Sequence, residues 1–100
     1  MIYLKIRVRI NPNKQTEFDQ AVTHILNDDY CKEGCFKFDI TRSLDDSTLY
    51  LYTEEWADTE TLQKHLNTDQ FHSLLGAMKV LGDIVDSRII KSESEEQIVL

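Results

Sequence analysis

Long apolar runs and basic residues are both scarce in this 100-residue chain. No stretch approaches the roughly 20 consecutive apolar residues that a membrane span requires. There are 11 lysines and arginines against 18 aspartates and glutamates, which gives a formal net charge of −7 at pH 7. Phosphate binding needs a basic face, and anionic lipids attract basic segments. The charge balance therefore argues against a nucleic-acid partner and against docking to a membrane surface.

The sequence also has little that would suit an oxidising compartment. Its two cysteines, Cys31 and Cys35, are too few for the disulfide framework of a small secreted domain. They also lack the partners at C-x2-C spacing that a zinc site needs. We therefore expect two reduced, partly buried thiols, and a redox pair is the alternative. The first residues interleave charges with apolar side chains, unlike a signal peptide, so we expect a cytoplasmic location.

Sequence signatures of the common catalytic classes are missing as well. The chain has no glycine-rich phosphate loop, no nucleophile elbow and no cluster of residues at metal-ligand spacing. The acidic pairs Asp45-Asp46 and Glu54-Glu55 fit a turn and a helix approach better than an acid–base pair. We therefore expect the protein to use no cofactor and no metal.

What is present predicts a single folded domain. Apolar residues make up 41% of the chain and charged residues 29%, as in ordinary globular proteins. One hundred residues leave no room for a second core. The clearest element is residues 2–10, where apolar residues alternate strictly with aromatic and basic residues. This period of two predicts a strand with one aliphatic face.

Caps and apolar spacing predict two helical regions. The first begins at Asn11-Pro12, because asparagine caps free amides and proline suits the first turn. Its apolar stripe consists of Phe18, Val22, Ile25 and Leu26. The second region begins with a cap at Asp58, breaks at residues 67–69 and restarts at Phe71. Gly76 lies inside the restarted helix, where it costs about 1 kcal/mol relative to alanine and suggests a close approach of another element.

Three further strands are predicted at residues 35–42, 49–56 and 84–90. The first of them places Phe36, Phe38 and Ile40 on one face. The resulting order, βαββαβ, is that of the ferredoxin-like split βαβ fold, an α+β fold with an antiparallel sheet. We assign this domain to residues 1–91. Residues 92–100 form a polar tail, either frayed or docked by its last three apolar residues.

Two helices can cover only one face of a four-stranded sheet. The other face would carry Tyr3 and either the Leu49/Leu51 row or the Tyr50/Tyr52 row. An exposed face with so much apolar surface would be an interaction site. We therefore infer a homodimer in which two sheets meet face to face, and a monomer with a half-exposed sheet is the alternative.

Three segments carry a family resemblance: EGCFKFDI at residues 33–40, YLYTEEWAD at 50–58 and HLNTDQF at 65–71. Together they resemble the antibiotic biosynthesis monooxygenase family, whose members form dimeric α/β barrels. The resemblance implies a pocket between the sheet and the helices. It also implies one of several activities: cofactor-free oxygenation of hydroquinones or polyphenols, quinol monooxygenation, haem degradation, or isomerisation of a phosphorylated signalling sugar.

The family's branches match this chain unequally. The haem-degrading branch relies on an Asn, a Trp and a His, and this chain has Ile6, His65 and Leu75 at the corresponding positions. His65 instead occupies a position where quinol-monooxygenase-like and isomerase-like members also have a histidine. Those members usually carry a second histidine after the helix break, where this chain has Asp69-Gln70.

His65 is the predicted catalytic residue. An imidazole near neutral pH could remove a phenolic proton from a hydroquinone and leave an anion that reacts with oxygen. The alternative is a structural histidine that hydrogen-bonds a carbonyl group. The predicted pocket lining is apolar, as small-molecule sites usually are. It comprises Phe18, Val22, Phe36, Phe38, Trp56, Phe71, Leu75 and Met78, some of which could equally be core residues.

The leading hypothesis is a cofactor-independent monooxygenase that acts on a small quinol or aromatic hydroxyl compound. The alternatives are a non-catalytic small-molecule-binding or regulatory module and an isomerase of a small carbonyl compound. Apolar lining around His65 would favour the oxygenase, and a basic group beside it would favour the isomerase. A fully collapsed pocket would favour the binding module.

Overall fold

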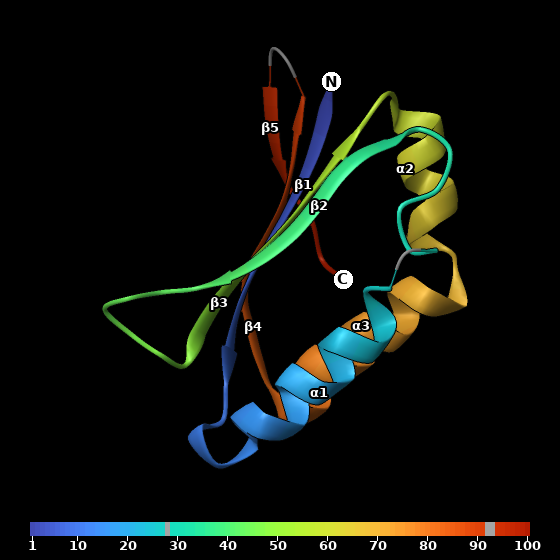
Figure 1. The fold of residues 1–100 in the computed structure, drawn as a ribbon. Coiled ribbons are helices and arrows are strands. Elements are labelled where there is room, and N and C mark those ends of the chain that lie inside the picture. Colours follow the sequence, from blue (N-terminus) through green and yellow to red (C-terminus); the bar gives the residue numbers. More distant parts are fainter. Residues whose placement is uncertain (28, 92–93) are drawn as a thin grey trace.

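The computed structural model describes residues 1–27, 29–91 and 94–100. Helices cover one face of a single antiparallel sheet (Figure 1), which confirms the predicted ferredoxin-like α+β fold. The strands are β1 (Ile2–Ile10), β2 (Cys35–Arg42), β3 (Leu49–Trp56), β4 (Gly82–Lys91) and β5 (Ser94–Gln97), in the order β2-β3-β1-β4-β5. The helices are the 3-10 helix η1 (Pro12–Lys14), α1 (Gln15–Ile25), α2 (Thr59–Leu66) and α3 (Asp69–Leu81).

The two central strands show why the core forms on the helix side. In β1 the even-numbered residues from Leu4 to Ile10 are fully buried, as the alternation predicts. In β3 the row that includes Tyr50 and Tyr52 is buried, whereas Leu49 and Leu51 are partly exposed on the open face. The sequence left open which row of β3 faces the helices. In the structure the tyrosine row faces them, and the Leu49/Leu51 row lies on the open face.

Side-chain caps start η1, α2 and α3. Asn11 accepts a hydrogen bond from the Asn13 amide at 3.0 Å. Asp58 accepts one from the Thr61 amide at 2.8 Å. Thr68 caps α3, so this helix begins at Asp69, two residues earlier than predicted. These caps satisfy amides that would otherwise lack partners, and they fix the break between α2 and α3. None of the helices in the described part of the chain is long and apolar enough to cross a membrane.

The predicted face assignment in β2 is wrong at its start. The register between β2 and β3 shifts between Cys35 and Lys37, so a bulge interrupts the alternation at Phe36. The Phe36 side chain is consequently 62% exposed, while Phe38 and Ile40 pack against the core. A β-bulge adds one residue to a strand and re-aims its side chain, which an alternation pattern does not reveal.

The sheet has a fifth strand that the sequence did not predict. Residues 94–97 pair with β4, and the Ile98 amide donates to the Ser87 carbonyl at 3.0 Å. Ile98 and Leu100 then pack against the core, while Val99 is exposed. The described part of the tail is therefore docked, which was one of the two alternatives. Its polar sequence conceals a strand because an edge strand needs backbone pairing rather than an apolar face.

Gly76 does not mediate a close approach, contrary to the interpretation above. A Cβ atom at Gly76 would meet no heavy atom of the described residues within 4 Å. We expect Gly76→Ala to raise the free energy of unfolding by about 0.5–1 kcal/mol, because alanine restricts the unfolded chain and favours the helix. Urea denaturation followed by circular dichroism measures this change.

Gly34→Ala is the matched comparison for Gly76→Ala. Gly34 has a φ of +88°, and a Cβ atom there would lie 2.6 Å from the Thr61 side chain. This variant should lose stability in the same assay, since both the backbone angle and the space exclude a side chain. A Gly76→Ala variant that also loses stability would contradict the expectation for Gly76.

Candidate active site

A disulfide joins Cys31 and Cys35 in the connection that leads into β2, with the two Cα atoms 5.4 Å apart. The predicted pair of reduced thiols is therefore wrong. The spacing argument made reduced thiols the expectation and a redox pair the alternative, and the two cysteines are bonded to each other. The left-handed turn at Gly34 folds this loop back on itself and brings the two cysteines within bonding distance.

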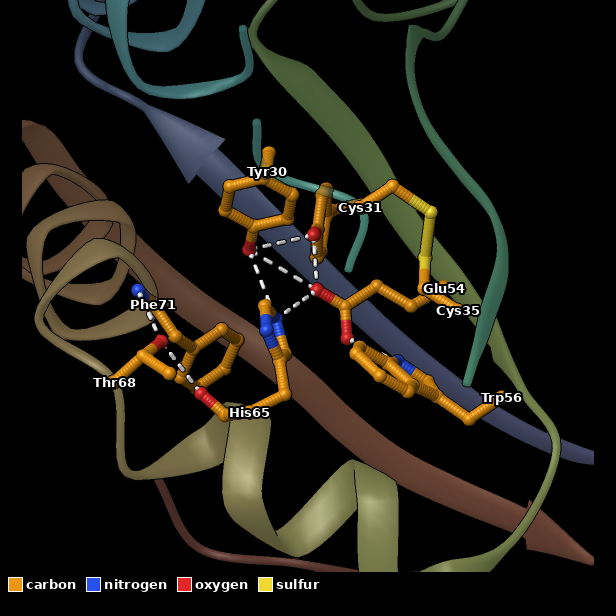
Figure 2. Close-up of polar contacts among 9 residues, drawn as sticks. Tyr30, Cys31, Cys35, Glu54, Trp56, His65, Thr68 and Phe71 are labelled. Carbon is orange, nitrogen blue, oxygen red and sulfur yellow. Dashed lines mark hydrogen bonds and ion pairs between the residues drawn. A yellow bond between two sulfur atoms is a disulfide. The ribbon is translucent and has the colours of Figure 1, made fainter. Parts of the chain in front are cut away.

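Glu54 is the centre of a buried polar cluster between β3 and α2 (Figure 2). Its side chain belongs to the inward row of β3, and the residue is only 1% exposed. Its Oε1 accepts a hydrogen bond from Trp56 Nε1 at 2.8 Å. Its Oε2 accepts from the Tyr30 hydroxyl at 3.0 Å and also from the Tyr52 hydroxyl. Four side chains therefore converge on one carboxylate, because His65 Nε2 lies 2.7 Å from the same Oε2.

The interpretation of Glu54 as a helix-approach charge is wrong. The residue lies within β3 on the same face as Tyr52 and Trp56, not at the strand's exit. The alternation of β3 could have revealed the burial of Glu54. Residues two positions apart in a strand share a face, so Glu54 is buried wherever the tyrosine row is buried. A carboxylate in a buried row requires hydrogen-bond donors around it, and a search for such donors points to the neighbouring tyrosines and to His65.

The two tyrosines of the cluster act as permanent donors. Burial raises the pKa of Tyr30 far above its usual range, and the charge of Glu54 raises it further. Burial likewise raises the pKa of Tyr52, again with a second contribution from Glu54. Both hydroxyls therefore keep their protons at any physiological pH. Tyr30 comes from the segment between α1 and β2, which the sequence analysis did not connect with the site.

His65 is held in place on several sides. It lies in the last turn of α2 and is 6% exposed. Its ring centre lies 4.7 Å from that of Trp56, 5.0 Å from that of Tyr30 and 5.2 Å from that of Phe71. The hydroxyl of Thr68 donates to its backbone carbonyl at 2.7 Å, which ties the residue to the helix break. The ring orientation is therefore determined by packing and by Glu54 together.

The contact with Glu54 assigns different roles to the two ring nitrogens of His65. Nε2 faces a carboxylate that only accepts hydrogen bonds, so Nε2 carries a proton. Nδ1 has no hydrogen-bond partner within the described ranges. No buried side-chain nitrogen or oxygen among those residues lacks a partner, so Nδ1 reaches the accessible surface. When Nε2 donates to the carboxylate, Nδ1 is the acceptor of the neutral ring.

A cavity of about 300 Å³ lies where His65 meets the surface. Trp56 and His65 form its aromatic side, α2 forms one wall and the disulfide loop forms the other. Its lining residues are Lys32, Glu33, Trp56, Thr61, Lys64, His65 and Thr68. The pocket is therefore not collapsed. It is also not purely apolar, because two lysines border it.

The predicted lining residues are distributed over several places. Trp56 lines the cavity together with His65, the predicted catalytic residue. Phe71 and Phe38 stand behind the site, where they contact the rings of His65 and Tyr30. The remaining residues do not border this cavity: Phe18, Val22 and Met78 are buried in the core, Leu75 packs against it, and Phe36 is exposed.

The raised pKa of Tyr52 predicts a loss of stability in alkali. An unfolded tyrosine ionises near pH 10, whereas folded Tyr52 keeps its proton there. The stabilisation is complete below about pH 10 and is lost as the pH rises further, because only the unfolded state releases the proton. We expect Tyr52→Phe to show a smaller fall in melting temperature between pH 9 and 11 than the wild type. Tyr3→Phe on the opposite sheet face is the control, and an equal fall in all three proteins would contradict the expectation.

The architecture and the cluster define a small ferredoxin-like α+β protein with a histidine–carboxylate pair at the edge of a cavity. The pattern of the antibiotic biosynthesis monooxygenase family matches residues 1–75 of the chain. This chain therefore belongs to the antibiotic biosynthesis monooxygenase family.

Individual relatives agree with this assignment. "Putative monooxygenase YcnE" of Bacillus subtilis (strain 168) is 22% identical over 81 residues, which cover 81% of this chain and 85% of that protein. A structure named as a "putative antibiotic biosynthesis monooxygenase" from Deinococcus radiodurans superposes with a TM-score of 0.76 at 21% identity, covering 100% and 98% of the two chains. SnoaB of Streptomyces nogalater, named as a cofactor-independent oxygenase, superposes with a TM-score of 0.76 at 14% identity, covering 93% of each chain. At these identities, the structural likenesses show the fold alone.

Proposed function

We propose that the protein is a cofactor-independent monooxygenase that oxidises a small quinol or another aromatic hydroxyl compound. The observation that carries this proposal is the pair of His65 and Glu54 at the edge of a cavity that His65 lines. Membership of the family supports it, as do the names of the relatives. A cytoplasmic location stays a prediction.

The chemistry begins with proton removal by His65. Nδ1 accepts the phenolic proton of the substrate, while Nε2 continues to donate to Glu54. The carboxylate stabilises the imidazolium that results, and the ring of Trp56 offers a flat apolar surface to the aromatic anion. The anion is electron-rich enough to react with oxygen. One oxygen atom enters the substrate and the other leaves as water. An anthrol whose CH position is oxidised to a carbonyl supplies all the electrons that this reduction of oxygen requires.

Oxygen uptake by the purified, metal-free protein tests the proposal. The substrates would be a panel of hydroquinones and anthrols, each measured against its spontaneous oxidation rate in the same buffer. Uptake above the spontaneous rate, with one atom of isotopically labelled oxygen in the product, is the expected result. The absence of such uptake across the panel would overturn the oxygenase proposal, and a coloured preparation or stoichiometric metal would overturn its cofactor independence.

An isomerase of a small carbonyl compound is the second candidate. It is favoured by Lys32 and Lys64, which border the same cavity as His65 and could hold an anionic group of the substrate. Proton exchange from solvent deuterium into a phosphorylated hydroxy-ketone, without oxygen consumption, would favour this candidate. If neither reaction occurs, a binding or regulatory module is the interpretation that remains.

We also propose that two copies associate through the open face of the sheet. This face carries Leu49 and Leu51 together with Lys5, Arg7 and Asp39, three charged residues that form no ion pair within the described part of the chain. Apolar surface flanked by unpaired charges of both signs suits a self-complementary interface. We expect a dimer by sedimentation at micromolar concentration and a folded monomer for Leu51→Glu. A wild-type protein that sediments as a monomer would contradict this proposal.

A further inference from the structure

The segment that closes the site is attached to the sheet by a disulfide. Tyr30 precedes Cys31 directly and lies outside any helix or strand, yet it is only 1% exposed. Its hydroxyl contacts Tyr52, Glu54 and His65, at 2.8, 3.0 and 3.2 Å respectively. Figure 2 shows the Tyr30 hydroxyl pointing into this cluster, and the disulfide is drawn on the same side of Glu54. Tyr30 therefore covers His65, although the segment that carries Tyr30 has little regular structure of its own.

The two ends of the disulfide loop are held differently. At the Cys35 end, the chain is already part of the sheet, because Cys35 pairs with Trp56 and the Gly34 carbonyl accepts from the Ala57 amide at 2.8 Å. At the Cys31 end, the neighbouring Tyr30 amide donates only to the local Asn27 carbonyl, at 3.0 Å. The disulfide thus ties the Cys31 end of the loop, which lies outside the sheet, to the Cys35 end, which is part of it.

The same loop forms one wall of the cavity. Lys32 and Glu33 lie between the two cysteines and face α2 across the cavity, where Lys64 and His65 form the other wall. Both cysteines are only partly buried, so a small thiol can approach the bond. Loss of the bond would therefore loosen the cavity wall and the tyrosine cover together, while leaving the sheet intact.

We propose that Cys31–Cys35 is a redox-active bond through which a dithiol reductant controls access to His65. A thiolate of the reductant attacks one cysteine sulfur, forms a mixed disulfide and releases the other cysteine as a thiolate that takes up a proton. The second thiol of the reductant then displaces the protein sulfur and closes its own disulfide. The protein gains two electrons and two protons, and the reductant loses them. In the reduced state, Tyr30 leaves Glu54 and His65, and the cavity opens. The proposal does not depend on the oxygenase chemistry.

Chemical modification of histidine tests this proposal without using enzymatic activity. The native protein is treated with dithiothreitol, desalted under argon and exposed briefly to diethylpyrocarbonate, and each histidine is then quantified by peptide mass spectrometry. We expect a several-fold faster modification of His65 than in the oxidised protein. His24 and His72 are exposed in the folded chain and serve as internal controls whose rates should not change.

Two variants separate release of the loop from other effects. Cys31→Ser/Cys35→Ser should show the fast His65 rate with or without dithiothreitol. Tyr30→Phe, which keeps the ring and the disulfide, should retain most of the protection in the oxidised state. Circular dichroism should show a cooperative thermal transition for the reduced protein and for the double serine variant.

Three results would overturn the proposal. One is a failure of dithiothreitol to release two alkylatable thiols from the folded protein. Another is an unchanged His65 rate although both thiols are free. The last is loss of the cooperative thermal transition on reduction, which would make the disulfide a support of the whole fold rather than a control of the cavity.

Discussion

Glu54→Ala is expected to lower the free energy of unfolding by several kcal/mol, since each buried donor that loses its acceptor costs about 1–3 kcal/mol. The substitution leaves the Trp56 N–H, two tyrosine hydroxyls and His65 Nε2 without their shared acceptor. Buried donors that lose their acceptor carry the full cost of desolvation. Because a domain of this size has a total stability of about 5–15 kcal/mol, the loss is a large share of it.

Urea denaturation followed by far-ultraviolet circular dichroism measures this effect. Trp56 fluorescence is less suitable, since the substitution changes the tryptophan's own environment. Glu60→Ala is the matched control, because the Glu60 side chain is 80% exposed and pairs with Lys64 at 3.5 Å on the surface of α2. Such exposed pairs contribute less than about 1 kcal/mol. Equal losses in the two variants would show that the carboxylate of Glu54 does not hold the cluster together.

His65→Ala is expected to lower the catalysed rate of oxygen uptake by about 10²- to 10⁴-fold, the range contributed by a positioned general base. The fold should survive, because Glu54 retains three other donors. The deficit should shrink as the pH rises, since the substrate phenol then ionises in solution without the base. His72→Ala is the control, because His72 is exposed on α3.

Glu54→Gln tests whether Glu54 acts through His65. The amide keeps the size of the side chain but removes the charge that stabilises protonated His65, so uptake should fall in the same direction as in His65→Ala. Combining the two substitutions should add little to the loss from His65→Ala alone, because the residues act as one unit. Uptake that is unchanged in His65→Ala would remove His65 from the catalytic machinery and leave the oxygenase proposal standing.

Local sequence patterns predicted most of the architecture. The strict alternation of β1, the Asn11 and Asp58 caps and the break at residues 67–69 each depend on residues within a few positions of one another. Such features follow from backbone geometry and short-range hydrogen bonds, so the βαββαβ order could be derived without a structure. The same patterns placed His65 on an apolar helix near the break, where it does lie beside a cavity.

Packing decided what the patterns left open or misread. Period-two alternation divides β3 into two rows, but both rows contain large apolar side chains, and only the position of the helices determines that Tyr52 and Glu54 point inward. The polar β5 forms because the edge of β4 offers backbone partners, which its own composition does not reveal.

The sequence by itself determined the order of the elements, the family and the candidate base, because each of these is encoded in short, contiguous segments. Only the tertiary structure decided the partners of that base. Glu54 lies 11 positions from His65 and Tyr30 lies 35 positions away, so their contact depends on how α2 and the disulfide loop fold over the sheet. Hydrogen bonds between such distant residues form only after the chain has packed, and no local pattern specifies them.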